Sequence, residues 1–287
     1  MSYDTPNALR IALEQRLLSG STATGVSLDR LRRRVVFERI ISRLQRAEPE
    51  RWVLKGGMAL EIRLRDNARL TKDIDLGLRD EVLDPDELRD RLVEALGADP
   101  DGDRFVLTVG PMKEMMEDGS GLATWRVKVT AKLADREFGR IQVDVSPRVG
   151  ELSRTELVQL PNSLEFAEVT TPQVEIIDVH RHAAEKYHGM SKDFGDRENS
   201  RVRDLVDLVI LREHELLEPP DLASELRDVW EERNGSDPPP QLPDLPGSWR
   251  LRYERQAAEL DLDTASFPAA VEIVVALWAE MFPDKET

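Results

Sequence analysis

Two aspartates separated by one residue, Asp73 and Asp75, have the spacing in this sequence that most clearly fits a chemical role. They stand in the segment 72–78, where charged and apolar residues alternate as in a half-buried strand. Because alternate side chains of a strand share a face, both carboxylates project together while Ile74 turns to the core. Carboxylates about 6 to 7 Å apart along one strand can jointly hold Mg²⁺, which prefers carboxylate and phosphate oxygens.

Gly56 and Gly57 add a second part to this pattern. They form a predicted tight turn with Lys55, between a short strand at 52–54 and a helix at 58–65. Glycine lets the backbone approach a ligand, and the first turn of a helix offers unpaired N–H groups and a positive dipole end to phosphates. The order of strand, glycine turn, helix and Asp-x-Asp strand therefore predicts a metal–triphosphate site, although Asp-x-Asp alone also fits a solvated strand edge.

Predicted strands gather in the first half of the chain and predicted helices in the second, which is typical of an α+β fold. We expect N-terminal helices in residues 1–50, a mixed-sheet core in 51–165 and a helical C-terminal domain in 166–287. The predicted strands are 52–54, 72–78, 105–109, 123–131 and 139–145; the predicted helices are 8–18, one that Ser27 caps, 58–65, one that Asp84 and Pro85 start, 176–190, 200–216, 220–232, 248–260 and 269–281; and the predicted loops are 20–25, 112–121 and the proline-rich linker 237–246.

The composition excludes several classes of protein. The 287 residues have a net charge of −16, which rules out a protein that coats nucleic acid through overall basic charge. Cysteine is absent, which excludes disulfides, thiolate nucleophiles, zinc–thiolate sites and iron–sulfur clusters. No apolar signal segment or run of about 18 apolar residues occurs, so we expect a soluble cytoplasmic protein without a membrane partner.

The charges are unevenly distributed. Residues 217–287 hold 16 acidic and 6 basic side chains, so most of the negative charge lies in the last quarter of the chain. The predicted helix after Ser27 instead carries seven arginines between Arg30 and Arg46. They form either a solvated helix face or a contact surface for a polyanion.

The segment 54–60, which contains Gly56 and Gly57, together with Asp73-Ile74-Asp75 and a later Val143-Asp144-Val145, resembles the nucleotidyltransferase superfamily. More narrowly, the segments 54–60 and 71–76 resemble the AbiEii/AbiGii toxin family, which includes the MenT toxins. The segment 184–188 is similar to the later lysine motif of that family, and 201–208 is similar to its Arg-x-Lys-Asp-x-x-Asp motif. The resemblance covers residues 52–210 and implies a nucleotidyltransferase-like mixed sheet.

The resemblance also implies roles for single residues, here given as expectations. The implied catalytic residues are Asp73, Asp75, Lys186 and Asp204; the implied NTP-binding residues are Lys55, Gly56, Gly57, Thr71, Lys186 and Asp207; and the implied metal ligands are Asp73, Asp75 and Asp144. Asp144 is expected to be a third ligand or a base for the attacking hydroxyl.

Each of these residues also has a structural interpretation. Asp144 fits a solvated strand end and Lys186 a solvated helix face. Thr71 fits a β-branched residue entering a strand, while the resemblance to some MenT toxins implies that it is a target of inhibitory phosphorylation. Asp204 and Asp207 lie on or beside the face opposite an apolar helix stripe, where they can pair with neighbouring arginines.

Three histidines, His180, His182 and His188, fall within nine residues. On an α-helix His180 and His182 diverge by about 200°, so we expect surface or packing roles rather than a shared metal site.

The function that the resemblance implies is that of a toxin of a toxin–antitoxin system. With Mg²⁺ and an NTP, for which the resemblance implies CTP, it would add nucleotides to the 3′ end of tRNA and block translation, and a cognate antitoxin would be its partner. Two alternatives stay open: a nucleotidyltransferase that modifies a protein hydroxyl or a small molecule, and an inactive NTP-binding module. The candidate RNA contacts are Lys55, Arg63, Arg65, Arg69, Lys72, Arg126, Lys128 and the run Arg32 to Arg34.

Overall fold

The computed structural model describes residues 3–69, 71–80, 84–115, 123–147, 152–195 and 198–283. The chain divides into two compact units. The first comprises Met1–Arg63 and Leu70–Ile177, and the second comprises Leu64–Arg69 and Asp178–Thr287. The second unit thus takes a short piece of chain from between the two segments of the first.

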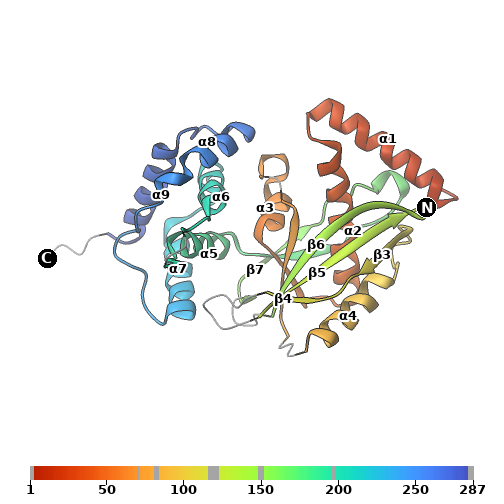
Figure 1. Cartoon of the computed structure of the whole chain (residues 1–287), viewed down its shortest axis with the longest axis horizontal. Helices are drawn as coiled ribbons and strands as arrows, with labels where there is room; N and C mark the ends of the chain where they lie inside the picture. Colours follow the sequence, from red (N-terminus) through yellow and green to blue (C-terminus); the bar gives the residue numbers. More distant parts are fainter. Residues whose placement is uncertain are drawn as a thin grey trace. The chain divides into compact units, whose positions relative to one another are not determined.

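The first unit is built on one mixed sheet, in the order β3-β5-β6-β2-β1-β8-β7, with β4 also paired to β5 (Figure 1). The pairs β2–β6 and β1–β8 are parallel and the other pairs are antiparallel, which confirms the predicted α+β class with a mixed sheet. The strands are β1 (Trp52–Lys55), β2 (Asp73–Leu78), β3 (Phe105–Val109), β4 (Lys113–Met115), β5 (Thr124–Leu133), β6 (Arg136–Pro147), β7 (Thr155–Gln159) and β8 (Gln173–Ile177).

Alternation of buried and less buried residues along β5, and along β6 from Arg140 to Ser146, separates the two faces of the sheet. Trp125, Val127 and Val129 are buried on one face, which lies toward the helices, because α2 packs on β6 and α4 on β3. The opposite face carries the intervening polar residues and is called the polar face below. The residues that define the polar face are Asp73, Asp75, Arg126, Lys128, Gln142 and Asp144.

The first helix is longer than predicted. α1 spans Pro6–Thr24 and ends at Gly25, which adopts a left-handed conformation (φ 73°). The segment 20–25 is therefore helical up to Thr24, and its prediction as a loop was wrong. The hydroxyls of Thr22 and Thr24 donate to the carbonyls four residues earlier, which lets these residues continue the helix.

Three further helices belong mainly to the first unit. α2 (Leu28–Ala47) begins at Ser27, whose side chain accepts the Arg30 N–H, as predicted. α4 (Pro85–Gly97) is capped by Asp84, also as predicted. α3 (Gly56–Leu64) is followed by the short 3₁₀ helix η1 (Arg65–Asn67). Part of the predicted loop 112–121 is the strand β4, and residues 116–121 of it lie outside the described residues.

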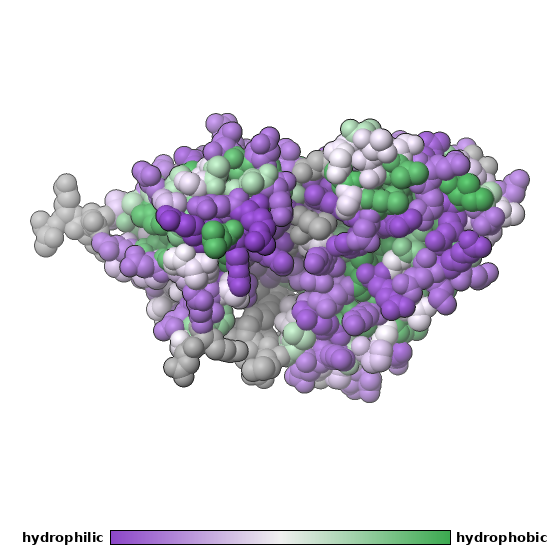
Figure 2. Space-filling model, turned by 45° about the horizontal axis from the view of Figure 1, so that its top comes forward, coloured by the Kyte–Doolittle hydropathy of each residue, from purple (hydrophilic) through white to green (hydrophobic). Residues whose placement is uncertain are grey.

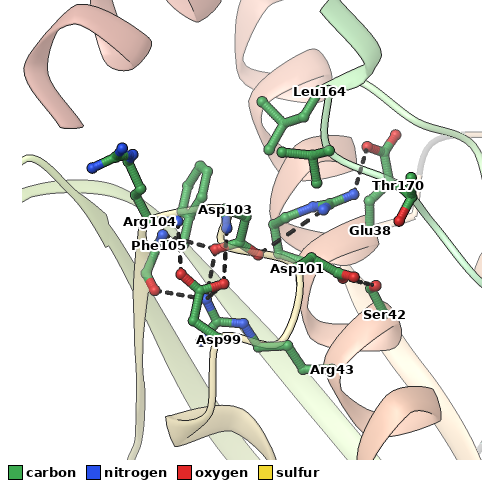
Figure 3. A network of polar contacts seen from close by, with 12 residues as sticks. Glu38, Ser42, Arg43, Asp99, Asp101, Asp103, Arg104, Phe105, Leu164 and Thr170 are labelled. Atoms are coloured by element: carbon green, nitrogen blue, oxygen red, sulfur yellow. Dashed lines mark hydrogen bonds and ion pairs between the residues drawn. The ribbon is translucent and has the colours of Figure 1, made fainter. Parts of the chain in front are cut away.

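The arginines of α2 do not form one common surface, because some are buried and others are half-buried or exposed. Arg39 and Arg43 are fully buried. Arg43 donates to Asp103 and to the Phe105 carbonyl (Figure 3). It also donates to the Leu96 carbonyl. The remaining arginines of α2 pair mostly with acidic residues of this unit: Arg30 and Arg34 with Glu61, Arg32 with Glu14, Arg33 with Asp29 and Arg46 with Asp101. Carboxylates placed around the helix use up the charge that a polyanion would need, so this helix is a structural element.

The boundary between the sheet and the helical part lies later than predicted. The strand β8 occupies Gln173–Ile177 between β1 and β7, so strands do not stop near residue 165. The unit boundary falls at 177/178 instead of 165/166, and the N-terminal helices belong to the sheet unit. Asp178 marks the boundary chemically because its side chain accepts the N–H groups of His180 and Arg181 at the start of the next helix.

Within the second unit, helices surround a core rich in aromatic rings. Tyr187, Trp230, Trp249, Tyr253 and Trp278 are all buried there. The helices of this unit are α5 (Val179–Ser191), α6 (Val202–Glu213), α7 (Pro219–Asn234), α8 (Arg250–Glu259), α9 (Phe267–Met281) and the 3₁₀ helix η4 (Gly247–Trp249). A further 3₁₀ helix, η3 (Glu165–Ala167), belongs to the first unit. The predicted linker 237–246 has no helix or strand, as expected.

The surface is mainly hydrophilic. On the face drawn in Figure 2, apolar residues show only in separate patches. Among the described helices, none is both long enough and apolar enough to span a membrane.

Candidate functional site

A row of charged residues crosses the polar face at right angles to the strands. Asp75 on β2 is in register with Lys55 on β1 and, on the other side, with Asp144 on β6. Asp144 is in register with Arg126 on β5, which is in register with Lys113 on β4. Directly opposed residues of neighbouring strands have their side chains on the same face. The row therefore consists, in order across the sheet, of one cation, two carboxylates and two cations: Lys55, Asp75, Asp144, Arg126 and Lys113.

Asp73 begins a second, shorter row. It lies two residues before Asp75 on the same face, in register with Gln142, which is in register with Lys128. Both aspartates are half-buried. The structure therefore brings together Asp73, Asp75 and Asp144, as the sequence predicts.

The two glycines lie in the first turn of α3, where the sequence predicts a separate turn. α3 begins at Gly56, which has φ 58°. A Cβ atom at Gly56 would lie 1.8 Å from Oδ2 of Asp75. The carboxylate of Asp75 thus packs directly on the backbone at the start of the helix, where the helix dipole favours negative charge. A residue with a side chain at position 56 would overlap the Asp75 carboxylate, so this contact requires glycine there. Gly57, the next residue, is buried.

Asp144 is held by a bidentate ion pair. Nε of Arg126 donates to Oδ1 of Asp144 at 2.8 Å, and Nη2 donates to Oδ2 at 2.7 Å. The hydrogen bond to Asp144 is the main cause of the raised pKa of the Arg126 guanidinium, and the charges of Asp73 and Asp75 raise it further. The Arg126 guanidinium therefore interacts electrostatically with all three carboxylates.

Thr71 and Lys55 flank the aspartates. The Thr71 hydroxyl is buried and donates to the backbone carbonyl of Asp73 at 3.2 Å, so it braces the start of β2. Lys55 is also buried, at the end of β1. Both therefore lie beside the predicted metal ligands.

The donor set of the polar face fits a hard divalent cation. Asp73 and Asp75 provide oxygen ligands at alternate positions of one strand, and Mg²⁺ keeps several waters and phosphate oxygens beside one or two carboxylates. Within the described ranges, no three His, Asp or Glu side chains form a ready-made metal cluster. Asp73 and Asp75 are the residues that would hold the ion, and Asp144 forms the bidentate pair with Arg126.

The second unit contains the other predicted residues in a buried ion-pair cluster. Nζ of Lys186 on α5 lies 2.6 Å from Oδ2 of Asp207 and 3.5 Å from Oδ1 of Asp204, both on α6. Arg69 adds two further bonds to Asp207, at 2.8 and 3.0 Å, and Arg201 lies 3.4 Å from Asp204. The structure thus brings Lys186, Asp204 and Asp207 together.

The cluster corrects two expectations. Lys186 is 5% exposed, so it does not lie on a solvated helix face, and Asp204 and Asp207 are 7% and 0% exposed because α6 is buried on nearly all sides. Burial would raise the pKa of Asp207, but Lys186 and Arg69 outweigh it and hold that pKa below its usual value. Arg69 was predicted as an RNA contact, and its position just after a short helix gave no sign that it pairs with Asp207.

The remaining basic candidates for RNA binding fall into two groups. Arg63 is tied to Glu156 and to the Ile177 carbonyl, at 2.8 and 2.9 Å. Arg65, Lys72 and Lys128 are exposed.

The three histidines take structural positions. His180 accepts the N–H of Glu218 at 3.0 Å, and His182 is buried. His188 lies edge-on to Trp230, with its Nε2 2.7 Å from Oδ1 of Asn234.

The fold is similar to that of a known structure, and a second structure covers most of the chain. MenT4, a nucleotidyltransferase toxin from Mycobacterium tuberculosis H37Rv, is 19% identical, with a TM-score of 0.60 over 95% of this chain and 90% of that chain. A protein from H. pylori, provisionally assigned as a nucleotidyltransferase, is 18% identical, with a TM-score of 0.48 over 91% of this chain and 100% of that chain. No curated protein matches the sequence.

The family match is more specific than the likeness in fold. The family described as nucleotidyl transferase AbiEii toxin, type IV TA system, matches residues 39–276, which include both clusters of charged residues described above. The chain therefore belongs to the AbiEii family of nucleotidyltransferase toxins of type IV toxin–antitoxin systems.

Proposed function

We propose that this toxin is a divalent-metal-dependent enzyme that transfers a nucleotide from an NTP such as CTP to the 3′ end of tRNA and so blocks translation in the cytoplasm. The observation that best supports the proposal is that the polar face combines the carboxylates Asp73 and Asp75 with exposed basic side chains. A cognate antitoxin, implied by the family, is its proposed protein partner.

The proposed reaction is an in-line transfer. The 3′-hydroxyl oxygen bonds to the α-phosphorus while the bond from that phosphorus to the bridging oxygen breaks, pyrophosphate leaves, and the hydroxyl proton passes to water. A divalent ion, when bound at Asp73 and Asp75, supplies charge neutralisation for the triphosphate. Lys55 and Arg126 place fixed positive charge on either side of these carboxylates, and Gly56 keeps Asp75 at the start of α3.

An RNA acceptor is supported by basic residues that continue the polar face along β4, β5 and β6. Lys113 is in register with Arg126, Lys128 with Gln142, and Thr130 with Arg140. The three outer cations, Lys113, Lys128 and Arg140, are exposed. Because phosphate binding depends on the contacting lysines and arginines and not on net charge, a chain of charge −16 can still bind tRNA here.

The cluster of the second unit receives its proposed role from the family resemblance alone. We propose that Lys186 contacts the triphosphate and that Asp204 and Asp207 support it. Lys186→Ala is then expected to lower the transfer rate at saturating tRNA far more than it weakens tRNA binding.

The test is a transfer assay with purified protein, Mg²⁺, each labelled NTP in turn and total tRNA. We expect label on the tRNA 3′ end, loss of transfer with EDTA, and loss by more than about 100-fold in Asp73→Asn and Asp75→Asn at an unchanged unfolding midpoint. Label on a protein or a small molecule instead would refute the RNA acceptor. NTP binding without any transfer would refute the enzymatic function.

The basic residues Lys113, Lys128 and Arg140, called the basic track here, have their own test. Lys128→Glu with Arg140→Glu is expected to weaken tRNA binding by about 10-fold or more at moderate salt and to lower the salt dependence by about two phosphate contacts. Arg255→Glu, an exposed arginine on α8, is the matched control and is expected to leave binding unchanged. Equal effects of both changes would refute a track on the polar face.

A further inference from the structure

The ion pair between Arg126 and Asp144 has the features of a permanent part of the polar face. The two residues are directly opposed on β5 and β6, and the guanidinium meets the carboxylate with two parallel bonds at 2.8 and 2.7 Å. Such a fork is about twice as strong as a neutral hydrogen bond and is fixed in direction. Asp144 is 13% exposed and Arg126 34%, so solvent weakens the pair only in part.

The pair also changes the charge of the carboxylate group as a whole. Three carboxylates stand in neighbouring positions, because Asp75 is in register with Asp144 and Asp73 is two residues away. Three such charges repel one another unless cations lie between them. Arg126 neutralises one of the three charges. The group formed by Asp73, Asp75, Asp144 and Arg126 therefore has the net negative charge of about two carboxylates.

We propose that Arg126 is the resident cation of this site, and that by holding Asp144 it restricts the metal ion of the proposed reaction to Asp73 and Asp75. Arg126 is then a positioning residue, and Asp144 serves to orient the guanidinium and not to bind the metal. The inference rests on the proposed function for the presence of the metal. It differs from the expectation that Asp144 is a third ligand.

The geometry also shows what Arg126 offers once it is fixed. The fork uses Nε and Nη2, and the third nitrogen, Nη1, stands outside the pair. A cation held at this place supplies charge that many phosphoryl-transfer sites obtain from a second metal ion. The inference therefore predicts one strongly bound divalent ion per chain rather than two.

The test measures Mn²⁺ binding to the full chain by electron paramagnetic resonance and calorimetry, without substrate. Asp73→Asn and Asp75→Asn are each expected to weaken binding by at least about 10-fold, and Asp144→Asn by less than about 3-fold. Arg126→Gln releases Asp144 to the metal, so it is expected to tighten binding by at least about 10-fold. In that background, Asp144→Asn is expected to reverse the gain, and this coupling separates a specific role from a structural one.

Lys132→Gln is the matched control because Lys132 is an exposed cation on the same strand as Arg126. It is expected to change Mn²⁺ affinity by less than about 3-fold. Arg126→Lys keeps the charge but not the fork, so it is expected to fall between the wild type and Arg126→Gln. Thermal unfolding of every variant identifies those that fail to fold.

Failure of the inference differs from failure of the proposed function. If Asp144→Asn weakens Mn²⁺ binding as much as Asp73→Asn, or if Arg126→Gln does not tighten it, the role of Arg126 is refuted while nucleotide transfer stands. If Mn²⁺ binds in the expected pattern but no nucleotide is transferred, the proposed function alone is refuted.

Discussion

The carboxylate of Asp75 occupies the space that a side chain at Gly56 would need: its Oδ2 lies 1.8 Å from the position of a Cβ atom there. Gly56 also has φ 58°, a conformation that other residues adopt only with strain. The start of α3 and the predicted metal ligand are therefore coupled, because a change at one moves the other.

Gly56→Ala is expected to abolish nucleotide transfer, by at least about 100-fold, because the new methyl group must displace the Asp75 carboxylate. Mn²⁺ affinity is expected to fall in parallel. Left-handed strain alone costs about 1 to 2 kcal/mol, so the protein should remain folded. Transfer rates, Mn²⁺ titration and thermal unfolding measure the three effects.

Gly25→Ala provides the control for strain. Gly25 has φ 73°, and nothing lies within 4 Å of its added Cβ atom. The Gly25→Ala variant is expected to lose about as much unfolding free energy as left-handed strain costs in Gly56→Ala, and to keep full transfer activity. Similar loss of activity in both variants would contradict a specific contact between Gly56 and Asp75.

Asp207→Asn is expected to destabilise the second unit by about 3 to 5 kcal/mol at pH 7, because Lys186 and Arg69 lose a buried counter-ion. The pKa of Asp207 is lowered in the folded state, so its stabilising effect is complete above about pH 4 and is lost as the pH falls through the folded pKa. Urea unfolding at pH 7 and pH 3 should therefore show a smaller difference from the wild type at pH 3. Asp228→Asn, exposed on α7, is the control.

Glu38 is expected to make stability fall as the pH rises toward neutrality. Burial raises the pKa of Glu38 to about 7, against the charges of Arg39 and Arg34 and the hydrogen bonds from Ser163. A raised carboxyl pKa stabilises most below the unfolded value of about 4.3, and this stabilisation disappears as the pH passes 7, by up to about 3 kcal/mol. Glu38→Gln should flatten the profile of unfolding free energy between pH 5 and 8, whereas the exposed Glu137→Gln should not.

Arg43→Met is expected to cost about 3 to 5 kcal/mol, because it removes three hydrogen bonds and leaves Asp103 buried without its main counter-ion (Figure 3). Arg46→Met, three residues later on α2 and 39% exposed, should cost less than about 1 kcal/mol. Chemical denaturation compares the two. Equal losses would show that α2 is held by its apolar residues alone.

The sequence predicted best those elements whose pattern is strictly periodic. β3 has the predicted bounds, and its residues are alternately buried and exposed along the whole strand. β8 was missed because its apolar run continues into the helix that follows, so that neither period dominates. The signal that could have found the boundary is Asp178, a residue type that favours helix N-termini.

Local spacing placed Asp73 and Asp75 on one face because both belong to one strand. The ion pairs of Arg126 with Asp144 and of Arg69 with Asp207 depend on strand order and on contacts between residues up to 138 positions apart. No local pattern contains this information. A helical wheel likewise cannot show that α6 is buried on its polar side.

The short segment Leu64–Arg69 belongs to the helical unit although it is flanked on both sides by the sheet unit. The two units are thus not successive pieces of chain, and a cut at 177/178 separates Asp207 from Arg69. A gene fragment that encodes only residues 178–287 would produce a helical unit lacking one of its own buried cations. Recombination between relatives should therefore preserve the pair only when residues 64–69 travel with the C-terminal half.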